Sequence, residues 1–246
     1  RFVCLFCSLF FYGSLFLFFF LSGRWARKNP PRGVADTFGT PFGQYQQKAI
    51  KPEFSFNAVA EKRIFIERED ALQSAVKLGC TTITRQNPDF LKLRVLMTLF
   101  GGYFGSRLMS NIREEKGYTY GISAGIMFYP DSGLLGISTE TDNEYVEPLI
   151  QEVYHEIDKL HQELVPMEEL TMVRNYMLGE MCRSYESAFS LSDAWIFIAT
   201  SGLDDLYFSR SLQAVNEVTP QEIQELAQRY LCKETLKEVI AGKKLS

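Results

Sequence analysis

Apolar positions recur with two different periods along this chain, and the two periods predict strands and helices respectively. Short apolar or alternating runs, bounded by turn-forming residues, indicate five strands. We expect them, in chain order, at 62–67, 73–78, 118–128, 133–140 and 236–241. Tyr129-Pro130-Asp131-Ser132 lies between the third and fourth of these and is typical of a hairpin turn.

Apolar residues spaced three or four apart predict helices in most of the remaining chain. We expect helices at 87–100, 106–115, 144–163, 167–184, 189–200, 205–215 and 219–231. The first begins at Asn87-Pro88-Asp89 and stops at Gly101-Gly102, and its apolar face carries Leu91, Val95, Leu96, Leu99 and Phe100. The last begins with Thr219 as N-cap and Pro220 in the first turn. Hairpin-like strand pairs and grouped helices together predict an α+β fold, a two-layer sandwich with helices on one face of a mainly antiparallel sheet.

The first sixty residues differ from the rest and predict a division of the chain. Residues 26–60 contain Asn29-Pro30-Pro31 and scattered glycines without sustained periodicity, so we interpret them as a linker. Residues 61–246 show the strand and helix periodicities of a folded domain. Residues 1–25 are rich in phenylalanine and are followed by Arg27 and Lys28.

Three interpretations of residues 1–25 remain open. About twenty apolar residues suffice to cross a bilayer, which favours a membrane anchor. The run lacks a polar face, so it also fits a corrupted or misread stretch. A signal peptide is the third alternative, although the apolar core is long and no clear cleavage site follows.

Composition excludes several other classes of protein. The 246 residues carry a net charge of −4 and have a pI near 5.4, which gives no support to nucleic-acid binding. The five cysteines are odd in number and irregularly spaced, so a disulfide framework is not expected. Apolar content of 46% is that of an ordinary globular protein.

Arg113 and Tyr120 are the strongest candidates for a chemical role. They lie seven residues apart, on either side of a predicted helix-to-strand turn that contains Gly117. Both side chains can then point toward one place in front of the sheet. A guanidinium and a phenol are suited to holding a backbone carbonyl or an oxyanion. Taken alone, Arg113 followed by Glu114-Glu115-Lys116 also fits a solvated helix end.

The two histidines do not form a metal motif. His155-Glu156 invites comparison with His-Glu-x-x-His, but the next histidine, His161, lies six residues on rather than four. Six residues correspond to about 600° of helix rotation, so the two rings face different directions. The sequence contains no His-x-x-Glu-His either. We therefore expect no metal bound by this chain and predict two solvated helix positions.

Three segments, in order, resemble one family. Gly-Gly-Tyr-Phe-Gly-Ser-Arg-Leu at 101–108 resembles a small-residue loop in the C-terminal half of insulinase-type (pitrilysin, processing-peptidase-like) zinc peptidases. The segment 112–120 looks like that family's Arg-Glu-x-x-Gly-x-x-Tyr, and 218–231 is similar to its closing helix. The resemblance covers about residues 55–246, and it implies that residues 1–25 are a corrupted or misread end of an upstream catalytic domain, as one of their three interpretations.

The resemblance implies a division of labour between two similar halves. The first half carries His-x-x-Glu-His and a zinc ion, and the second is metal-free and supplies an arginine and a tyrosine to the substrate. By position, these correspond to Arg113 and Tyr120. The implied partners are a catalytic domain or subunit and an extended peptide. We expect the three glycines to be tight-turn residues. The family suggests that the loop of Gly101, Gly102, Gly105 and Ser106 faces the substrate.

Two functions follow as alternatives. In the first, this chain is the substrate-binding half of a zinc endopeptidase, inactive alone because it lacks His-x-x-Glu-His. In the second, it is a non-catalytic structural subunit of the same fold, as in the core-protein relatives of respiratory complexes. We expect a bacterial cytoplasmic location, with the cell envelope as the alternative if residues 1–25 are an anchor.

Overall fold

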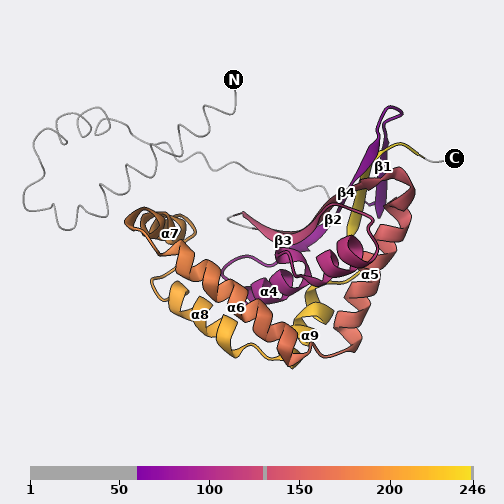
Figure 1. Ribbon diagram of the computed structural model, residues 1–246. Coiled ribbons are helices and arrows are strands. Elements are labelled where there is room, and N and C mark those ends of the chain that lie inside the picture. Colours follow the sequence, from indigo (N-terminus) through magenta and orange to yellow (C-terminus); the bar gives the residue numbers. More distant parts are fainter. Residues whose placement is uncertain (1–59, 130–131, 245–246) are drawn as a thin grey trace, which may run out of the picture. The chain divides into compact units, whose positions relative to one another are not determined.

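The computed structural model describes residues 60–129 and 132–244 (Figure 1). The chain divides into two compact units. One, the core unit, comprises Val59–Cys182 and Leu203–Ser246, while Arg183–Gly202 belong to the other. The expectations for residues 1–25 and for nearly all of the linker concern residues outside the described part.

The core unit is built on one five-stranded sheet with the order β1-β5-β2-β4-β3. Its strands are β1 (Arg63–Glu67), β2 (Gln73–Thr82), β3 (Ile122–Tyr129), β4 (Ser132–Asp142) and β5 (Lys237–Gly242). Neighbouring strands pair antiparallel except for β1 and β5, which are parallel. The long β2–β4 ladder runs from Thr82↔Gly133 to Gln73↔Asp142, and its second end lies beside the candidate site.

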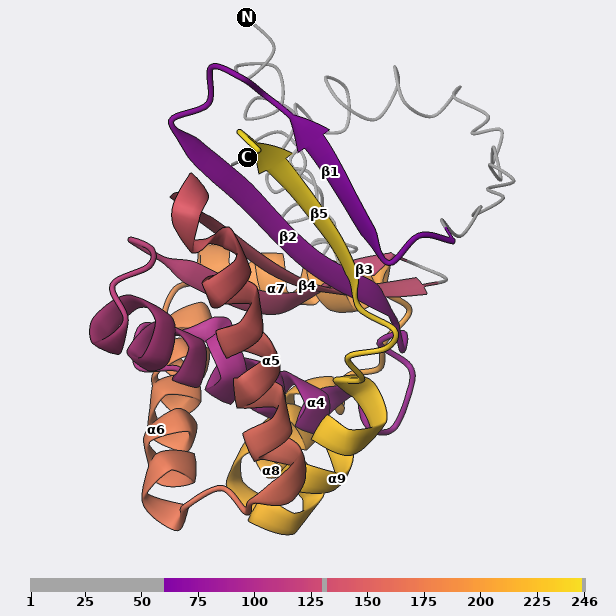
Figure 2. The same ribbon diagram turned by 90° about the vertical axis from the view of Figure 1, so that its right-hand side faces the viewer.

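Helices of the core unit lie on one side of this sheet (Figures 1 and 2). They are α4 (Phe90–Met97), α5 (Val146–Gln162), α6 (Met167–Ser184, whose last two residues belong to the other unit), α8 (Tyr207–Glu217) and α9 (Pro220–Tyr230), with shorter turns η2 (Thr98–Gly102), η3 (Met109–Glu115) and η4 (Asn143–Tyr145). Thr219 caps α9 through a capping box with Glu222, as its sequence predicts. The predicted sandwich of helices on one sheet face is confirmed.

The core lies between the helices and the covered face of the sheet. Alternate strand residues such as Val76, Leu78, Leu135 and Ile137 are fully buried there. They meet the apolar faces of α4 and α5, including Leu149. Complete burial of one such side chain contributes about 1.5–3 kcal/mol relative to exposure, so this core fixes which way β2 and β4 face.

The structure corrects several predicted boundaries. The strand predicted at 118–128 begins only at Ile122, because residues 118–121 bond to a helix end and to side chains instead of continuing the ladder. The strand predicted at 73–78 continues to Thr82. Leu91 is only half-buried, and Leu93 takes its place in the core. The hairpin is confirmed by the pair Tyr129↔Ser132, while its central residues 130–131 lie outside the described part.

The second unit contains helix α7 (Ala188–Thr200), where a helix is predicted. Ser187 caps it through a capping box with Ser190. Across the described ranges, no helix is both long and apolar enough to cross a membrane. The phenylalanine-rich segment 1–25 is not among the described residues.

Candidate functional site

Arg113 lies on η3, a short π-helical turn whose inner side is buried. Met109, Asn111 and Ile112 are buried beneath it, and Arg113 itself is half-buried. The Nδ2 of Asn111 donates to Oε1 of Glu156 over 2.7 Å and lies 3.0 Å from Oε2 of Glu152. Both carboxylates come from α5, so η3 is joined to that helix by apolar and polar contacts.

A second connection holds the start of this helical segment. The Nε and Nη2 of Arg107 donate to the two carboxylate oxygens of Glu169, each over 2.8 Å, in a bidentate pair with the first turn of α6. Burial disfavours the charged guanidinium, but the hydrogen bonds to Glu169 outweigh it and raise the pKa of Arg107. The Ser-Arg-Leu segment at 106–108 thus attaches this part of the chain to α6.

Gly117 ends η3 and turns the chain. Its φ of +68° lies in the left-handed region that L side chains rarely adopt. The N–H of Tyr118 donates to the carbonyl of Ile112 over 3.0 Å, which closes the end of the turn. The ring of Tyr118 stacks on Tyr145, with centroids 5.0 Å apart. This turn reverses the chain toward the sheet within a few residues.

Tyr120 lies on the irregular segment that joins this turn to β3. Its side chain is 93% exposed. The hydroxyl of Thr141 donates to the carbonyl of Tyr118 over 2.5 Å, and that of Thr139 lies 2.9 Å from the carbonyl of Gly121. The backbone on both sides of Tyr120 is therefore attached to β4, while its phenol projects into solvent.

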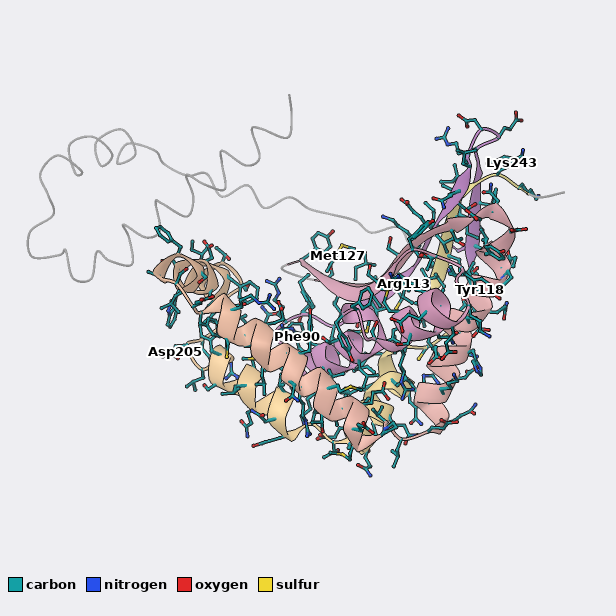
Figure 3. All side chains as sticks on the ribbon, viewed as in Figure 1. Phe90, Arg113, Tyr118, Met127, Asp205 and Lys243 are labelled. Atoms are coloured by element: carbon teal, nitrogen blue, oxygen red, sulfur yellow. The ribbon has the colours of Figure 1, made fainter. Side chains whose placement is uncertain are left out.

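Arg113 and Tyr120 line one open depression of about 580 Å³. The labels of Arg113 and Tyr118 in Figure 3 mark this region. It is lined by Gln73, Arg113, Glu114, Gly117, Tyr118, Thr119, Tyr120 and Asp142. The structure therefore brings the two predicted residues to the same place, together with the end of the β2–β4 ladder. A guanidinium and a phenol there can both donate hydrogen bonds to an oxygen of a ligand.

The glycine-rich loop at 101–106 does not line this depression but contacts one of its residues, Arg113, through Phe104. The guanidinium carbon of Arg113 lies 4.5 Å from the centroid of Phe104, an arrangement that attracts a cation to a ring. Gly101 is buried, and a Cβ there would lie 2.6 Å from the Cβ of Ala124 on β3. Gly101, Gly102, Gly105 and Ser106 are not among the residues that line the depression. Ser106 is buried.

The histidines lie on α5, away from the depression lining. His155 is exposed, as predicted. His161 differs from the expected solvated position, since it is half-buried and its Nε2 lies 3.0 Å from the carbonyl of Ala227 on α9. Among residues 60–129 and 132–244, no group of three or more His, Cys, Asp or Glu side chains is placed to hold a metal ion.

Sequence reasoning missed Phe104, Thr139 and Thr141. The threonines could have been found, because they continue the inward-facing positions of β4 after Leu135 and Ile137. A change from aliphatic to hydroxyl side chains on the covered face of a strand indicates that it faces polar backbone there. No sequence pattern marks Phe104, because its contact with Arg113 depends on how the chain turns between the two residues.

Comparison with known proteins gives consistent results. The family model described as "Peptidase M16 inactive domain" matches residues 23–177. The chain is 27% identical over 154 residues to "Uncharacterized zinc protease YmxG" of Bacillus subtilis, which covers 61% of this chain and 36% of that protein. It is 21% identical over 159 residues to "Probable inactive metalloprotease YmfF" of the same species, covering 64% of this chain and 37% of that protein.

A solved structure shows the same fold. The peptidase M16 inactive domain from Pseudomonas fluorescens superposes with a TM-score of 0.68 at 22% identity, over 75% of this chain and 44% of that one. The chain thus matches less than half the length of these relatives. Because the family model matches more than half of the chain, the protein belongs to the peptidase M16 inactive-domain family.

Proposed function

We propose that this chain is the substrate-binding, metal-free half of a zinc endopeptidase, in which Arg113 and Tyr120 hold the carbonyl of the peptide bond to be cleaved. The observation that carries the proposal is their shared depression. A zinc-bearing half with His-x-x-Glu-His would complete the enzyme, and the names of relatives such as the zinc protease YmxG support that partner.

The chemistry of the depression supports this assignment. Among the described residues Arg113 has no ion pair, and its guanidinium lies over the ring of Phe104. Its guanidinium N–H groups are therefore available to a ligand. The exposed phenol of Tyr120 is a second donor. Two donors positioned before the reaction stabilise negative charge as it develops on a carbonyl oxygen.

The test uses the chain assembled with its catalytic half, whether that half is encoded upstream or by a separate gene. We expect Arg113→Ala and Tyr120→Phe each to lower kcat for a fluorogenic peptide by about 100-fold, the usual effect of removing one oxyanion donor. Arg68→Ala and Tyr129→Phe are matched controls, because both side chains are exposed and do not line the depression. Unchanged kcat in both site variants would contradict the proposal.

A second candidate is a non-catalytic structural subunit, which the name of the inactive metalloprotease YmfF favours. The two functions differ in the partner half. Sequencing the partner decides between them, since a half without His-x-x-Glu-His has no zinc ligands to complete the site. In that case no peptide would be cleaved by the assembly, and Arg113→Ala would leave assembly unchanged.

A further inference from the structure

The phenol of Tyr120 is exposed, and no described side-chain contact orients it. No hydrogen bond or ring contact with another described residue holds its side chain. Gly117 and Gly121 lie on either side, and glycine gives a chain more backbone freedom than any other residue. The position and angle at which the side chain leaves the backbone are therefore set by whatever fixes residues 118–121.

The hydroxyls of three threonines fix that backbone. Thr141 donates to the carbonyl of Tyr118 over 2.5 Å. Thr139 lies 2.9 Å from the carbonyl of Gly121 and 2.9 Å from the hydroxyl of Thr119. The hydroxyl of Thr119 donates to the carbonyl of Glu140 over 2.6 Å and accepts from the N–H of Gly121 over 3.0 Å. These bonds attach the segment to β4 on both sides of Tyr120.

Two of these threonines lie on the inward-facing side of β4, in line with two buried aliphatic residues. On β4, the residues that face the helices are Leu135, Ile137, Thr139 and Thr141. Thr139 and Thr141 are only 5% and 1% exposed. Burying a hydroxyl costs free energy unless it is hydrogen-bonded, and here each one is bonded to the backbone that carries Tyr120. Packing alone does not require hydroxyls at these positions.

We propose that Thr139 and Thr141, acting with Thr119, are positioning residues that aim Tyr120 into the depression. The inference rests on the proposed function, since Tyr120 needs a fixed direction only if it donates to a substrate. Valine has the shape of threonine without the hydroxyl, so Thr139→Val and Thr141→Val release the segment with little change of volume. Serine keeps the hydroxyl and should restore the attachment.

The experiment combines kinetics of the assembled enzyme with ¹⁹F NMR of 3-fluorotyrosine placed at position 120. We expect Thr139→Val and Thr141→Val each to lower kcat by about 2- to 10-fold, as loss of one net hydrogen bond predicts. KM should change less, because Arg113 stays in place. In the assembly with an uncleaved peptide bound, the valine variants should shift the ¹⁹F signal toward that of a free, averaged ring, and Thr139→Ser should restore both readouts.

The control is Thr82→Val, the same chemical change in the same sheet. The hydroxyl of Thr82 is buried and has no hydrogen-bond partner in the described part of the chain, so its loss should leave kcat and the ¹⁹F signal unchanged. If Tyr120→Phe lowers kcat but Thr139→Val and Thr141→Val do not, the positioning role is wrong and the proposed function stands. If Tyr120→Phe itself has no effect, the proposed function falls and this inference falls with it.

Discussion

The two ends of the depression are held by different kinds of interaction. Arg113 lies on η3, where Ile112 is fully buried in the core and Asn111 is bonded to α5. Tyr120 lies on an irregular segment with no buried side chain, attached to β4 through threonine hydroxyls. One donor is therefore placed by hydrophobic burial and the other by hydrogen bonds to its backbone. The position of Arg113 should change only with substitutions that destabilise the whole fold. The position of Tyr120 should change with substitutions that cost little unfolding free energy.

The largest effect should come from the apolar anchor of the Arg113 end. Ile112→Ala leaves a cavity in the core beneath η3, and substitutions of this kind cost about 2–5 kcal/mol of unfolding free energy. Urea unfolding followed by circular dichroism measures it. Leu212→Ala on α8 is the control, because an exposed leucine should change stability by only about 0.5 kcal/mol. Equal losses of unfolding free energy in both variants would mean that Ile112 is not an apolar anchor of the Arg113 end.

The polar anchor of the same end should have the next largest effect. Asn111→Leu removes the donor to Glu156, a carboxylate only 4% exposed whose remaining described partner is Lys159. Leaving a buried polar group less satisfied costs about 1–3 kcal/mol. Asn216→Leu on the exposed side of α8 makes the same change in solvent and should be close to neutral. If Asn111→Leu were stabilising, the buried amide would not be an anchor.

These two anchors also show what sequence could and could not predict. The α+β fold, most elements and the pairing of Arg113 with Tyr120 follow from local periodicity, glycine placement and a motif with fixed spacing. Asn111 and its partners on α5 are more than forty positions apart. Nothing in the local pattern of either segment records that contact, so it could not be predicted from one sequence.

The misplaced start of β3 has a related cause. The run from Tyr118 alternates as a strand does, and periodicity alone therefore extends the strand too far. The backbone of residues 118–121 instead bonds to Ile112 and to threonine side chains, which are competing partners that a periodicity argument does not include. The error falls at the candidate site because the chain leaves regular structure there.

The turn between the two ends tests how they are joined. Gly117→Ala forces a Cβ into the left-handed region, although nothing lies within 4 Å of that Cβ. The cost is therefore conformational only, about 1–2 kcal/mol. Gly179→Ala within α6 also meets open space but has no positive φ, so it should stabilise by about 0.4–1 kcal/mol. Thermal unfolding of both variants should give shifts of opposite sign, and shifts of the same sign would contradict this account of the turn.

The smallest effect should come from Phe104, which is 62% exposed and contacts the guanidinium of Arg113. Phe104→Leu removes the ring while leaving an apolar side chain, and an exposed cation–π contact is worth about 0.5–1 kcal/mol. Global stability should hardly change. Arg113 would lose its described ring contact, so under the proposed function peptide affinity should fall by about two- to fivefold.

Phe65→Leu separates this effect from a general loss of aromatic surface. Phe65 is an exposed phenylalanine on β1, at the opposite edge of the sheet from β3, and it does not line the depression. Fluorescence anisotropy with a labelled peptide should report weaker binding for Phe104→Leu alone. Phe104→Tyr should bind as wild type, because a phenol keeps the ring face toward the guanidinium. If both leucine variants bind equally well, the ring of Phe104 does not help to hold Arg113, and the apolar and polar anchors of η3 are sufficient to place that end of the depression.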